Sequence, residues 1–335
     1  GRIDNKQFEN GPGAKKGPTL LSSSLDRSEN LALYAENSFY FLPSVALVTG
    51  TQFLHATRDR ENRGGSADGS TEFNLWSPKI GLLWDIDRTW QAYFNIARSA
   101  EVPSFGESSS AASPPIPFTD IKAQRATTYE IGTRGRRPDF TWDVALYRME
   151  ISNELMCISN PTAATGTCQV VNADQTVHQG IELGFGAVVM KGLAAPGPSP
   201  DKLWLNVAYT LNDFRFDDDV KFGNNILPGA PRHVVRTELL YKHPSGVFFG
   251  PNVEWVPQAY YVDSANTLKT AADGIWGLKL GFDNGGPFSA YVEGRNLSDV
   301  AYIASVSITD VAAANSALFE PGTGRAVFAG VKYRW

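Results

Sequence analysis

Residues 203–212 read Leu-Trp-Leu-Asn-Val-Ala-Tyr-Thr-Leu-Asn, and every odd-numbered position in this run carries an apolar or aromatic side chain. The even-numbered positions carry Trp, Asn, Ala, Thr and Asn. Because successive side chains of a β-strand point to opposite faces, the run predicts a strand with one apolar face. The same period of two recurs in other stretches: 90–97, 129–134, 181–186, 276–282 and 327–335.

Working outward from these runs, the sequence predicts an all-β chain of about thirteen long strands. Most are ten to fourteen residues long, whereas strands of soluble proteins usually have ~5–6 residues and a tilted strand crossing a bilayer needs ~9–11. Strand length therefore favours a membrane-spanning antiparallel sheet. The predicted strands are 30–41, 44–57, 72–85, 88–101, 124–136, 139–152, 176–188, 203–216, 233–243, 247–261, 274–283, 288–302 and 325–335.

The connections between these strands alternate between short turns and long polar loops. Short turns follow residues 41, 85, 136, 243 and 283, while the segment 189–202 is a longer member of the same class. The long loops are 58–71, 102–123, 153–175, 217–232, 262–273 and 303–324. Short periplasmic turns and long extracellular loops are typical of an outer-membrane β-barrel.

The composition excludes several classes of protein. Thirty Lys and Arg against thirty-five Asp and Glu give a net charge of −5, which argues against a nucleic-acid binder. Hydrophobic residues make up 42% and aromatics 12%, so the chain is not of the disordered class. The sequence contains no nucleophile-elbow, zinc-protease, P-loop or dinucleotide-binding motif, so we expect neither an enzyme nor a cofactor.

In lipid, only a closed sheet satisfies every backbone amide, so the polar face of each strand must look into a lumen. This predicts lumen-facing positions for Glu130, Arg134, Glu182, Arg236, Glu238 and Arg295. Aromatic residues near the strand ends suit the two interfacial girdles of such a barrel. The competing interpretation, in which the aromatics fill a soluble core, gives no reason for their position at strand ends. They are Phe39, Trp84, Trp90, Trp142, Trp204, Trp255, Phe282 and Trp335.

A set of short segments between residues 30 and 335 carries a further signal in its order and spacing. The segments are Leu33–Asn37, Ser77–Trp84, Tyr93–Ser99, Val102–Glu107, Thr128–Gly132, Gln179–Leu183, Leu227–His233, Gly294–Tyr302 and Gly324–Trp335, the last of which ends the chain on an aromatic residue. Taken together, they resemble the TonB-dependent outer-membrane receptors, whose barrels also end on an aromatic residue.

The resemblance implies a barrel of about 22 strands around a plug domain. Residues 30–335 would then form the C-terminal portion of the barrel and residues 1–29 an extracellular loop or entry segment. The family's plug, its TonB-contacting segment and nine further strands have no counterpart in the sequence, which begins at Gly1 without Met. We therefore expect a longer protein whose remainder is cleaved, unsequenced or a separate chain. A short self-closing pore would instead conflict with the even strand number of bacterial barrels.

The resemblance also implies a function in the bacterial outer membrane. The expected role is active import of a scarce ligand, energised by the TonB complex of the inner membrane through the missing N-terminal part. Ferric siderophores are the commonest cargo of the family, and cobalamin, haem, copper or a quinone cofactor stay open. The expected partners are the plug and remaining strands, which the lumen-facing charges would contact, the small-molecule or metal-chelate ligand, and outer-membrane lipid with lipopolysaccharide. The alternative is a passive porin-like channel.

Cys157 and Cys168 are the two cysteines, eleven residues apart in the loop 153–175. An oxidising location predicts a disulfide between them, and the alternative is a thiol pair that binds a metal. The four histidines, His55, His178, His233 and His243, lie on separate segments with no metal-ligand spacing, so we expect no metal site. His178 and His233 lie near the extracellular ends of their strands, where a ligand contact is open to them.

Arginines near the predicted extracellular loops form a further candidate site. Arg58 and Arg60 fall in the loop 58–71, and Arg98 and Arg125 flank the loop 102–123. The planar fork of arginine suits carboxylate and phosphate. These four side chains are predicted extracellular ligand contacts, with lipopolysaccharide phosphates as the alternative partner.

Overall fold

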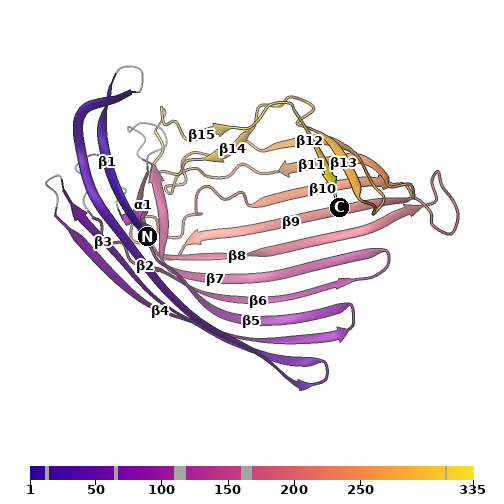
Figure 1. Ribbon diagram of the computed structural model, residues 1–335, viewed down its shortest axis with the longest axis horizontal. Coiled ribbons are helices and arrows are strands. Elements are labelled where there is room, and N and C mark those ends of the chain that lie inside the picture. The colour runs from indigo at the N-terminus through magenta and orange to yellow at the C-terminus, as the bar shows by residue number, and fades with distance from the viewer. Residues whose placement is uncertain (12–14, 64–66, 109–117, 160–167, 314) are drawn as a thin grey trace.

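The computed structural model describes residues 1–11, 15–63, 67–108, 118–159, 168–313 and 315–335. These residues form one fourteen-stranded antiparallel sheet in which consecutive strands pair from β1 to β13 and β13 pairs with β16, so that β1 and β16 are its two edges. The sheet curves into an open trough, with the short turns at one end and the long connections at the other (Figure 1). This architecture confirms the predicted all-β fold.

The sheet strands are β1 (Arg2–Gly11), β2 (Lys15–Leu42), β3 (Val45–Asn62), β4 (Gly69–Asp87), β5 (Trp90–Glu101), β6 (Gln124–Arg136), β7 (Phe140–Ser159), β8 (Cys168–Lys191), β9 (Lys202–Phe216), β10 (His233–Lys242), β11 (Val247–Val256), β12 (Asp273–Asp283), β13 (Phe288–Arg295) and β16 (Ala326–Tyr333). Between β13 and β16 the chain forms a small hairpin, β14 (Ile303–Val306) and β15 (Phe319–Pro321). One short helix, α1 (Phe105–Ser108), lies between β5 and β6. No helix in the described parts of the chain is long and apolar enough to cross a membrane.

The structure differs from the sequence prediction over residues 1–29, which form strand in place of a loop. β1 pairs with the first half of β2, from Arg2 opposite Arg27 to Gly11 opposite Lys15. Residues 23–26 of β2 are all buried, so protein covers both faces of the strand there. A serine run at 22–24 can therefore occupy the strand without the alternation that a lipid-facing segment requires.

Several strands end at other residues than predicted, some later and some earlier. β3 continues to Asn62 and β4 begins at Gly69, so the two strands together take up more than half of the predicted loop 58–71. β11 ends at Val256, one residue before Pro257, which has no N–H for a further ladder bond. β13 ends at Arg295 because Asn296 adopts a left-handed conformation, with φ of 48°, and its side chain binds the backbone of Val300 instead.

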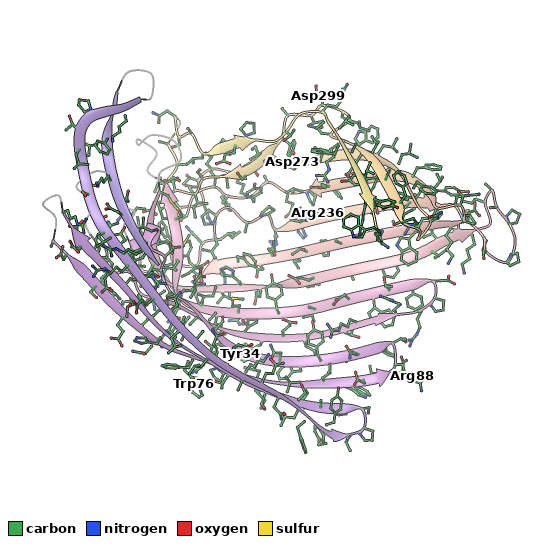
Figure 2. All side chains as sticks on the ribbon, viewed as in Figure 1. Tyr34, Trp76, Arg88, Arg236, Asp273 and Asp299 are labelled. Carbon is green, nitrogen blue, oxygen red and sulfur yellow. A yellow bond between two sulfur atoms is a disulfide. The ribbon has the colours of Figure 1, made fainter. Side chains whose placement is uncertain are left out.

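The two faces of the sheet differ sharply in chemistry. Phe94, Ile131 and Leu146 are consecutive register partners on β5, β6 and β7, and all three are exposed. We call the face that carries them the outer face, and on it Trp76 projects outside the curve of the sheet (Figure 2). From Trp76 to Trp84 on β4 the apolar band is nine residues long, or about 26 Å along the strand. This number of residues falls within the ~9–11 that a tilted strand needs to cross a bilayer.

The opposite, inner face is covered at its extracellular end by the long connections. One buried cluster joins Ala56, Phe73 and Leu75 of β3 and β4 to Ala123 of the β5–β6 connection. A second cluster joins strand residues to the β9–β10 connection, and its members are Met156, Ala173, Phe216 and Leu227. The chain therefore builds its largest cores where the loops fold into the mouth of the trough.

Candidate ligand site on the inner face

The six residues predicted to face a lumen share the inner face. Residues that pair across neighbouring strands point to the same face of the sheet, so the pairing identifies this face on each strand. On β9 and β10, Ala208 lies opposite Arg236, and Asn206 lies opposite Glu238. Arg134 on β6 donates from Nε to Oε1 of Gln91 on β5, at 3.0 Å. By the same alternation Glu130, Glu182 and Arg295 fall on this face.

Between β9 and β13 the inner face carries a ladder of opposite charges. Arg236 Nε lies 3.7 Å from Glu254 Oε2, Lys279 Nζ lies 3.8 Å from Glu238 Oε2, and Arg295 Nε lies 2.9 Å from Glu293 Oε1. These side chains line a hollow of about 560 Å³. Arg236 stands over the concave side of the sheet (Figure 2) and its side chain is 67% exposed.

A second cavity, of about 610 Å³, lies at the extracellular end of the inner face. Its walls come from distant parts of the chain, which meet only across the concave side of the sheet. They include Glu154 of β7, His178 of β8, Phe214 of β9, Leu227–Ala230 of the β9–β10 connection, and Ile308 and Glu320 from the β13–β16 region. We call it the mouth cavity.

The polar centre of the mouth cavity is the pair Glu154 and His178. The His178 Nε2 atom lies 3.2 Å from Glu154 Oε2, and the hydroxyl of Thr176 donates to the same carboxylate oxygen. The imidazole stacks on the ring of Phe214, with centroids 4.2 Å apart. The cavity thus offers a carboxylate, an imidazole and aromatic surface to one ligand.

Glu154 is a residue that sequence reasoning missed. Strict alternation along β7 would place its side chain on the outer face, opposite to Ile151. Asn153 adopts a left-handed conformation, with φ of 55°, and this interrupts the alternation so that Glu154 turns inward to His178. Asparagine is enriched in that conformation, but its presence in a strand does not reveal it. Lys279, Glu254 and Glu293 also belong to the site and follow the alternation.

Cys157 and Cys168 form a disulfide and line the mouth cavity, with Cα atoms 5.4 Å apart. The bond closes the extended hairpin of β7 and β8 beside the cavity. Residues 160–167, between the two cysteines, lie outside the described part of the chain. Because both sulfur atoms form this bond, neither cysteine has a free thiol that could bind a metal.

Arg58 and Arg60 do not lie in a surface loop, and that part of the prediction is wrong. Both are 4% exposed on the inner face of β3. Arg60 forms a bidentate ion pair with Asp26 of β2, with distances of 2.7 and 2.8 Å. Arg58 donates to the carbonyl oxygen of Pro103 at 2.8 Å and so holds the β5–β6 connection in place. Burial lowers the pKa of the Arg58 guanidinium, and the negative charge of Glu107 offsets part of this change.

Arg98 and Arg125 lie on the outer face of β5 and β6, where both are exposed. The structure therefore turns both side chains away from the mouth of the trough, and the mouth cavity does not include them.

The other histidine near an extracellular strand end, His233, does not line the mouth cavity. His233 lies on the outer face, with Nδ1 2.9 Å from the Tyr209 hydroxyl oxygen, so the two histidines near the strand ends face opposite ways. Within the described residues, no three His, Cys, Asp or Glu side chains gather in a way that could hold a metal ion.

Comparisons with known proteins agree with this geometry. The family described as "TonB dependent receptor-like, beta-barrel" matches residues 2–297. The catecholate siderophore receptor Fiu of Escherichia coli K12 is 24% identical over 255 residues, which is 72% of this chain and 31% of that receptor. The pesticin receptor of Yersinia enterocolitica is 24% identical over 222 residues, 64% of this chain and 31% of its own length.

Solved receptor structures share the fold. The ferric yersiniabactin uptake receptor FyuA from Yersinia pestis gives a TM-score of 0.68 at 16% identity, covering 99% of this chain and 49% of that one. Fiu from Escherichia coli K12, in its closed form, gives 0.65 at 19% identity, covering 92% and 45%. The chain thus spans about a third of the length of the curated relatives and about half of the length of the chains in these structures. The chain belongs to the TonB-dependent receptor family, as part of its β-barrel, and so to the outer membrane of Gram-negative bacteria.

Proposed function

We propose that this chain is the C-terminal part of the barrel of a receptor that imports a metal chelate with energy supplied through TonB. The relatives named above support this proposal, since they are described as a catecholate siderophore receptor and a ferric yersiniabactin uptake receptor. They are transport receptors, which also supports a role other than catalysis. A ferric siderophore is the ligand class we propose for this chain.

The mouth cavity is the observation that carries the proposal. Its volume of about 610 Å³ falls within the ~300–1,000 Å³ typical of small-molecule sites. It opens at the extracellular end of the inner face, where a ligand arriving from outside would first meet the barrel. His178 can donate a hydrogen bond to an anionic chelate, and the stacked ring of Phe214 gives it an aromatic wall.

The charge ladder below the mouth cavity has a different proposed partner. Arg236 and Glu254 form an ion pair whose side chains are still half-exposed or more. Such groups have unused hydrogen-bonding capacity, which a plug domain seated in the lumen would take up. Glu130, Arg134, Glu182, Glu238 and Arg295 are proposed to contact the plug or a passing ligand in the same way.

The proposal is tested with the full-length receptor, purified in detergent and then reconstituted in vesicles. Saturable quenching of tryptophan fluorescence by a ferric catecholate or a ferric hydroxycarboxylate is the expected binding signal. In cells, uptake of radioactive iron from the bound chelate should stop when the proton gradient is collapsed. Absence of binding to either class of chelate, together with steady ion conductance in planar bilayers, would overturn the proposal in favour of a passive channel.

A further inference from the structure

A fully buried carboxylate, Asp263, lies in the β11–β12 connection, residues 257–272, which does not line the mouth cavity. Its Oδ1 atom accepts from the backbone N–H groups of Thr267 and Leu268, both at 2.9 Å. Its Oδ2 atom accepts from the hydroxyl of Thr267 and from the backbone N–H of Ala312, the latter at 3.2 Å. Three of these bonds close the β11–β12 connection on itself, and the fourth joins it to the β13–β16 region.

The carboxyl group of Asp263 is held in its charged form. Burial raises its pKa, but the hydrogen bonds from Thr267, Leu268 and Ala312 together lower it by more, so the pKa lies below the ordinary value for aspartate. Hydrogen bonds to a charged acceptor are stronger than those between neutral groups. The four bonds are therefore suited to holding separate segments of the chain together.

The residues that follow Asp263 extend its link to the β13–β16 region. The backbone N–H of Ser264 donates to the carbonyl oxygen of Thr309, and that of Ala265 donates to the carbonyl oxygen of Asp310, both at 2.9 Å. Residues 306–308, which form one wall of the mouth cavity, directly precede Thr309 in the chain. The β11–β12 connection thus fixes this wall from behind.

The same connection also binds the β9–β10 connection, which supplies the other wall. The side chain of Asn266 accepts from the backbone N–H of Ile226 and donates to its carbonyl oxygen, both at 2.8 Å. The backbone N–H of Gly229 donates to the carbonyl oxygen of Tyr261 at 2.8 Å. Residues 227–230 line the mouth cavity, so this second wall is also fixed from behind.

The two walls meet each other at Gly229 and Ile308. A Cβ atom at Gly229 would lie only 3.0 Å from Cγ2 of Ile308, and the φ of Gly229 is 81°. The carbonyl oxygen of Ile308 in turn accepts from the backbone N–H of Ser159, at the end of β7, at 2.7 Å. With so close an approach, the shape of the mouth cavity depends on how the two walls are held against each other.

We propose that Asp263 is a positioning residue for the mouth cavity. It does not contact the ligand, and it acts by joining the β11–β12 connection to the β13–β16 region, which sets one wall of the cavity against the other. The role in ligand binding rests on the proposed function, whereas the joining of the walls can be measured without a ligand. The competing role is a local one, in which Asp263 closes only the turn of its own connection.

The substitution Asp263→Asn separates these two roles in the full-length receptor. The asparagine oxygen can still accept from the N–H groups of Thr267 and Leu268, so the turn of the connection is kept. Its NH₂ group cannot accept from the N–H of Ala312, so the bond to the β13–β16 region is lost. The heat-dependent gel shift of folded barrels checks that the variant is intact.

Hydrogen–deuterium exchange followed by mass spectrometry measures the effect on the walls without a ligand. In Asp263→Asn, the backbone amides of residues 226–230 and 306–310 should exchange about tenfold faster than in the wild type, although neither segment is altered. This factor is the one expected for the loss of one hydrogen bond to a charged group. Faster exchange confined to residues 257–272 would overturn the proposal and leave Asp263 with the local role.

The matched control is Asp219→Asn, which removes the same charge from another turn. The Oδ1 atom of Asp219 accepts from the backbone N–H groups of Lys221 and Phe222, at 2.8 and 2.9 Å, so its carboxylate closes a turn within the β9–β10 connection. Asp219→Asn should speed exchange around that turn and leave residues 306–310 as in the wild type. An equal rise at residues 306–310 in both variants would contradict a specific role for Asp263.

Fluorescence titration with a ferric catecholate and a ferric hydroxycarboxylate tests the role in binding. Asp263→Asn should raise the Kd of the chelate that the wild type binds by about tenfold without changing the number of sites, and Asp219→Asn should bind as the wild type does. Wild-type affinity in Asp263→Asn, despite faster exchange in both walls, would overturn the positioning role. If the wild type binds neither chelate, the proposed function fails, and the exchange pattern alone decides whether Asp263 fixes the two walls.

Discussion

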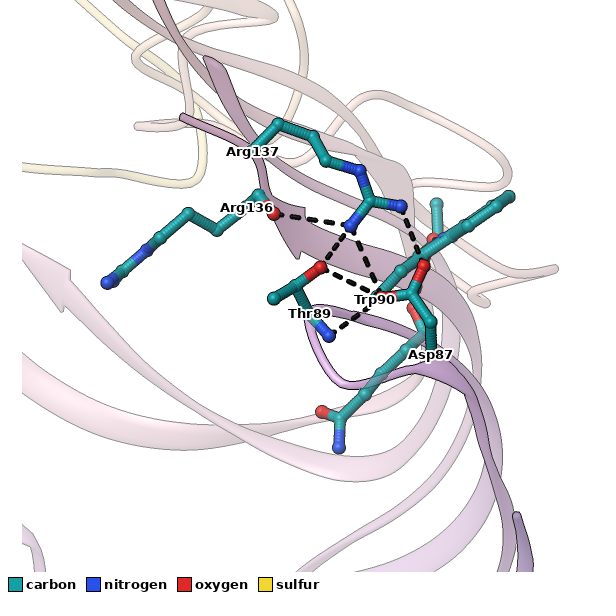
Figure 3. A network of polar contacts seen from close by, with 7 residues as sticks. Asp87, Thr89, Trp90, Arg136 and Arg137 are labelled. Atoms are coloured by element: carbon teal, nitrogen blue, oxygen red, sulfur yellow. Dashed lines mark hydrogen bonds and ion pairs between the residues drawn. The ribbon is translucent and has the colours of Figure 1, made fainter. Parts of the chain in front are cut away.

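Arg137 and Asp87 join two neighbouring periplasmic turns through a bidentate ion pair (Figure 3). The Arg137 Nη2 atom donates to Asp87 Oδ2 at 2.7 Å and Nη1 to Oδ1 at 3.2 Å. Nη1 also donates to the hydroxyl of Thr89, whose backbone N–H donates to the same carboxylate at 2.8 Å. The turn between β4 and β5 is thereby fixed to the turn between β6 and β7.

This pair makes a prediction about pH. Hydrogen bonds from Arg137 and Thr89 hold the pKa of Asp87 well below its ordinary value. A carboxyl group whose folded pKa is lowered stabilises the fold fully above its unfolded pKa and loses that contribution as pH falls through the folded pKa. Arg137→Ala should therefore lower the thermal unfolding temperature at pH 7 and still do so near pH 4, with the difference vanishing only in stronger acid.

The control for this pH prediction is Arg136→Ala, because the side chain of Arg136 is exposed and takes no part in the network. Thermal unfolding of the two variants, followed by circular dichroism across the pH range, makes the comparison. Equal unfolding temperatures for both variants at pH 7 would show that the pair contributes nothing to stability.

The two histidines near the extracellular strand ends form a matched test of the mouth cavity. His178 faces inward beside Glu154 and Phe214, whereas His233 faces outward against Tyr209. His178→Ala should weaken binding of a ferric chelate by about tenfold, the loss expected for one hydrogen bond to a charged ligand. His233→Ala should bind as the wild type does, and fluorescence titration measures both. Equal losses in the two variants would place the ligand elsewhere.

The buried pair Arg60 and Asp26 predicts a large effect on stability. The two side chains are 3% and 5% exposed, so Asp26→Leu would leave a guanidinium without its bidentate partner. We expect a loss of about 3–5 kcal/mol in the free energy of unfolding, which urea titration in detergent measures. On the opposite face of the same two strands, Arg27 and Glu61 form an exposed pair at 3.7 Å. Glu61→Gln should lower the free energy of unfolding by no more than about 1 kcal/mol. Equal losses from Asp26→Leu and Glu61→Gln would contradict the expectation that the buried pair contributes more than the exposed one.

The disulfide supports one wall of the mouth cavity. In the chain-entropy account, a bond closing a loop of this size contributes roughly 3 kcal/mol, so Cys157→Ser/Cys168→Ser should unfold at lower urea concentration than the wild type. Chelate binding should weaken because the cavity wall is no longer fixed. Dithiothreitol should reproduce both effects in the wild type and add nothing in the variant. The same unfolding midpoint and the same chelate affinity in the double variant as in the wild type would contradict this prediction.

The sequence predicts the fold well wherever lipid constrains the strands. Along β9, residues 203–212 must present apolar side chains to lipid on one face, and this period of two is visible without a structure. Where a strand rises above the apolar band, lipid imposes no such alternation. The serine run 22–24 therefore reads as a loop although it pairs within the sheet.

The site was predictable only in part, for a related reason. Arg236 and Glu238 follow the alternation of β10 and lie on the inner face as predicted. Glu154 does not, because the backbone conformation of Asn153 turns it and no residue type encodes that conformation uniquely. The burial of Arg60 depends on Asp26, which is 34 residues away and reaches it only through strand pairing.

The central claim is that one face of this sheet meets lipid and the other meets a hydrophilic lumen. Ile131 on the outer face and Glu130 on the inner face are adjacent on β6, and both cysteines of the chain are bonded to each other. With every cysteine outside residues 1–335 replaced by serine, a spin label can be attached to a single cysteine introduced at either position in the full-length receptor. Power-saturation electron paramagnetic resonance in vesicles should show Ile131→Cys accessible to oxygen but not to a polar nickel complex, and Glu130→Cys shielded from oxygen. Oxygen accessibility at Glu130→Cys equal to or greater than that at Ile131→Cys would contradict the account.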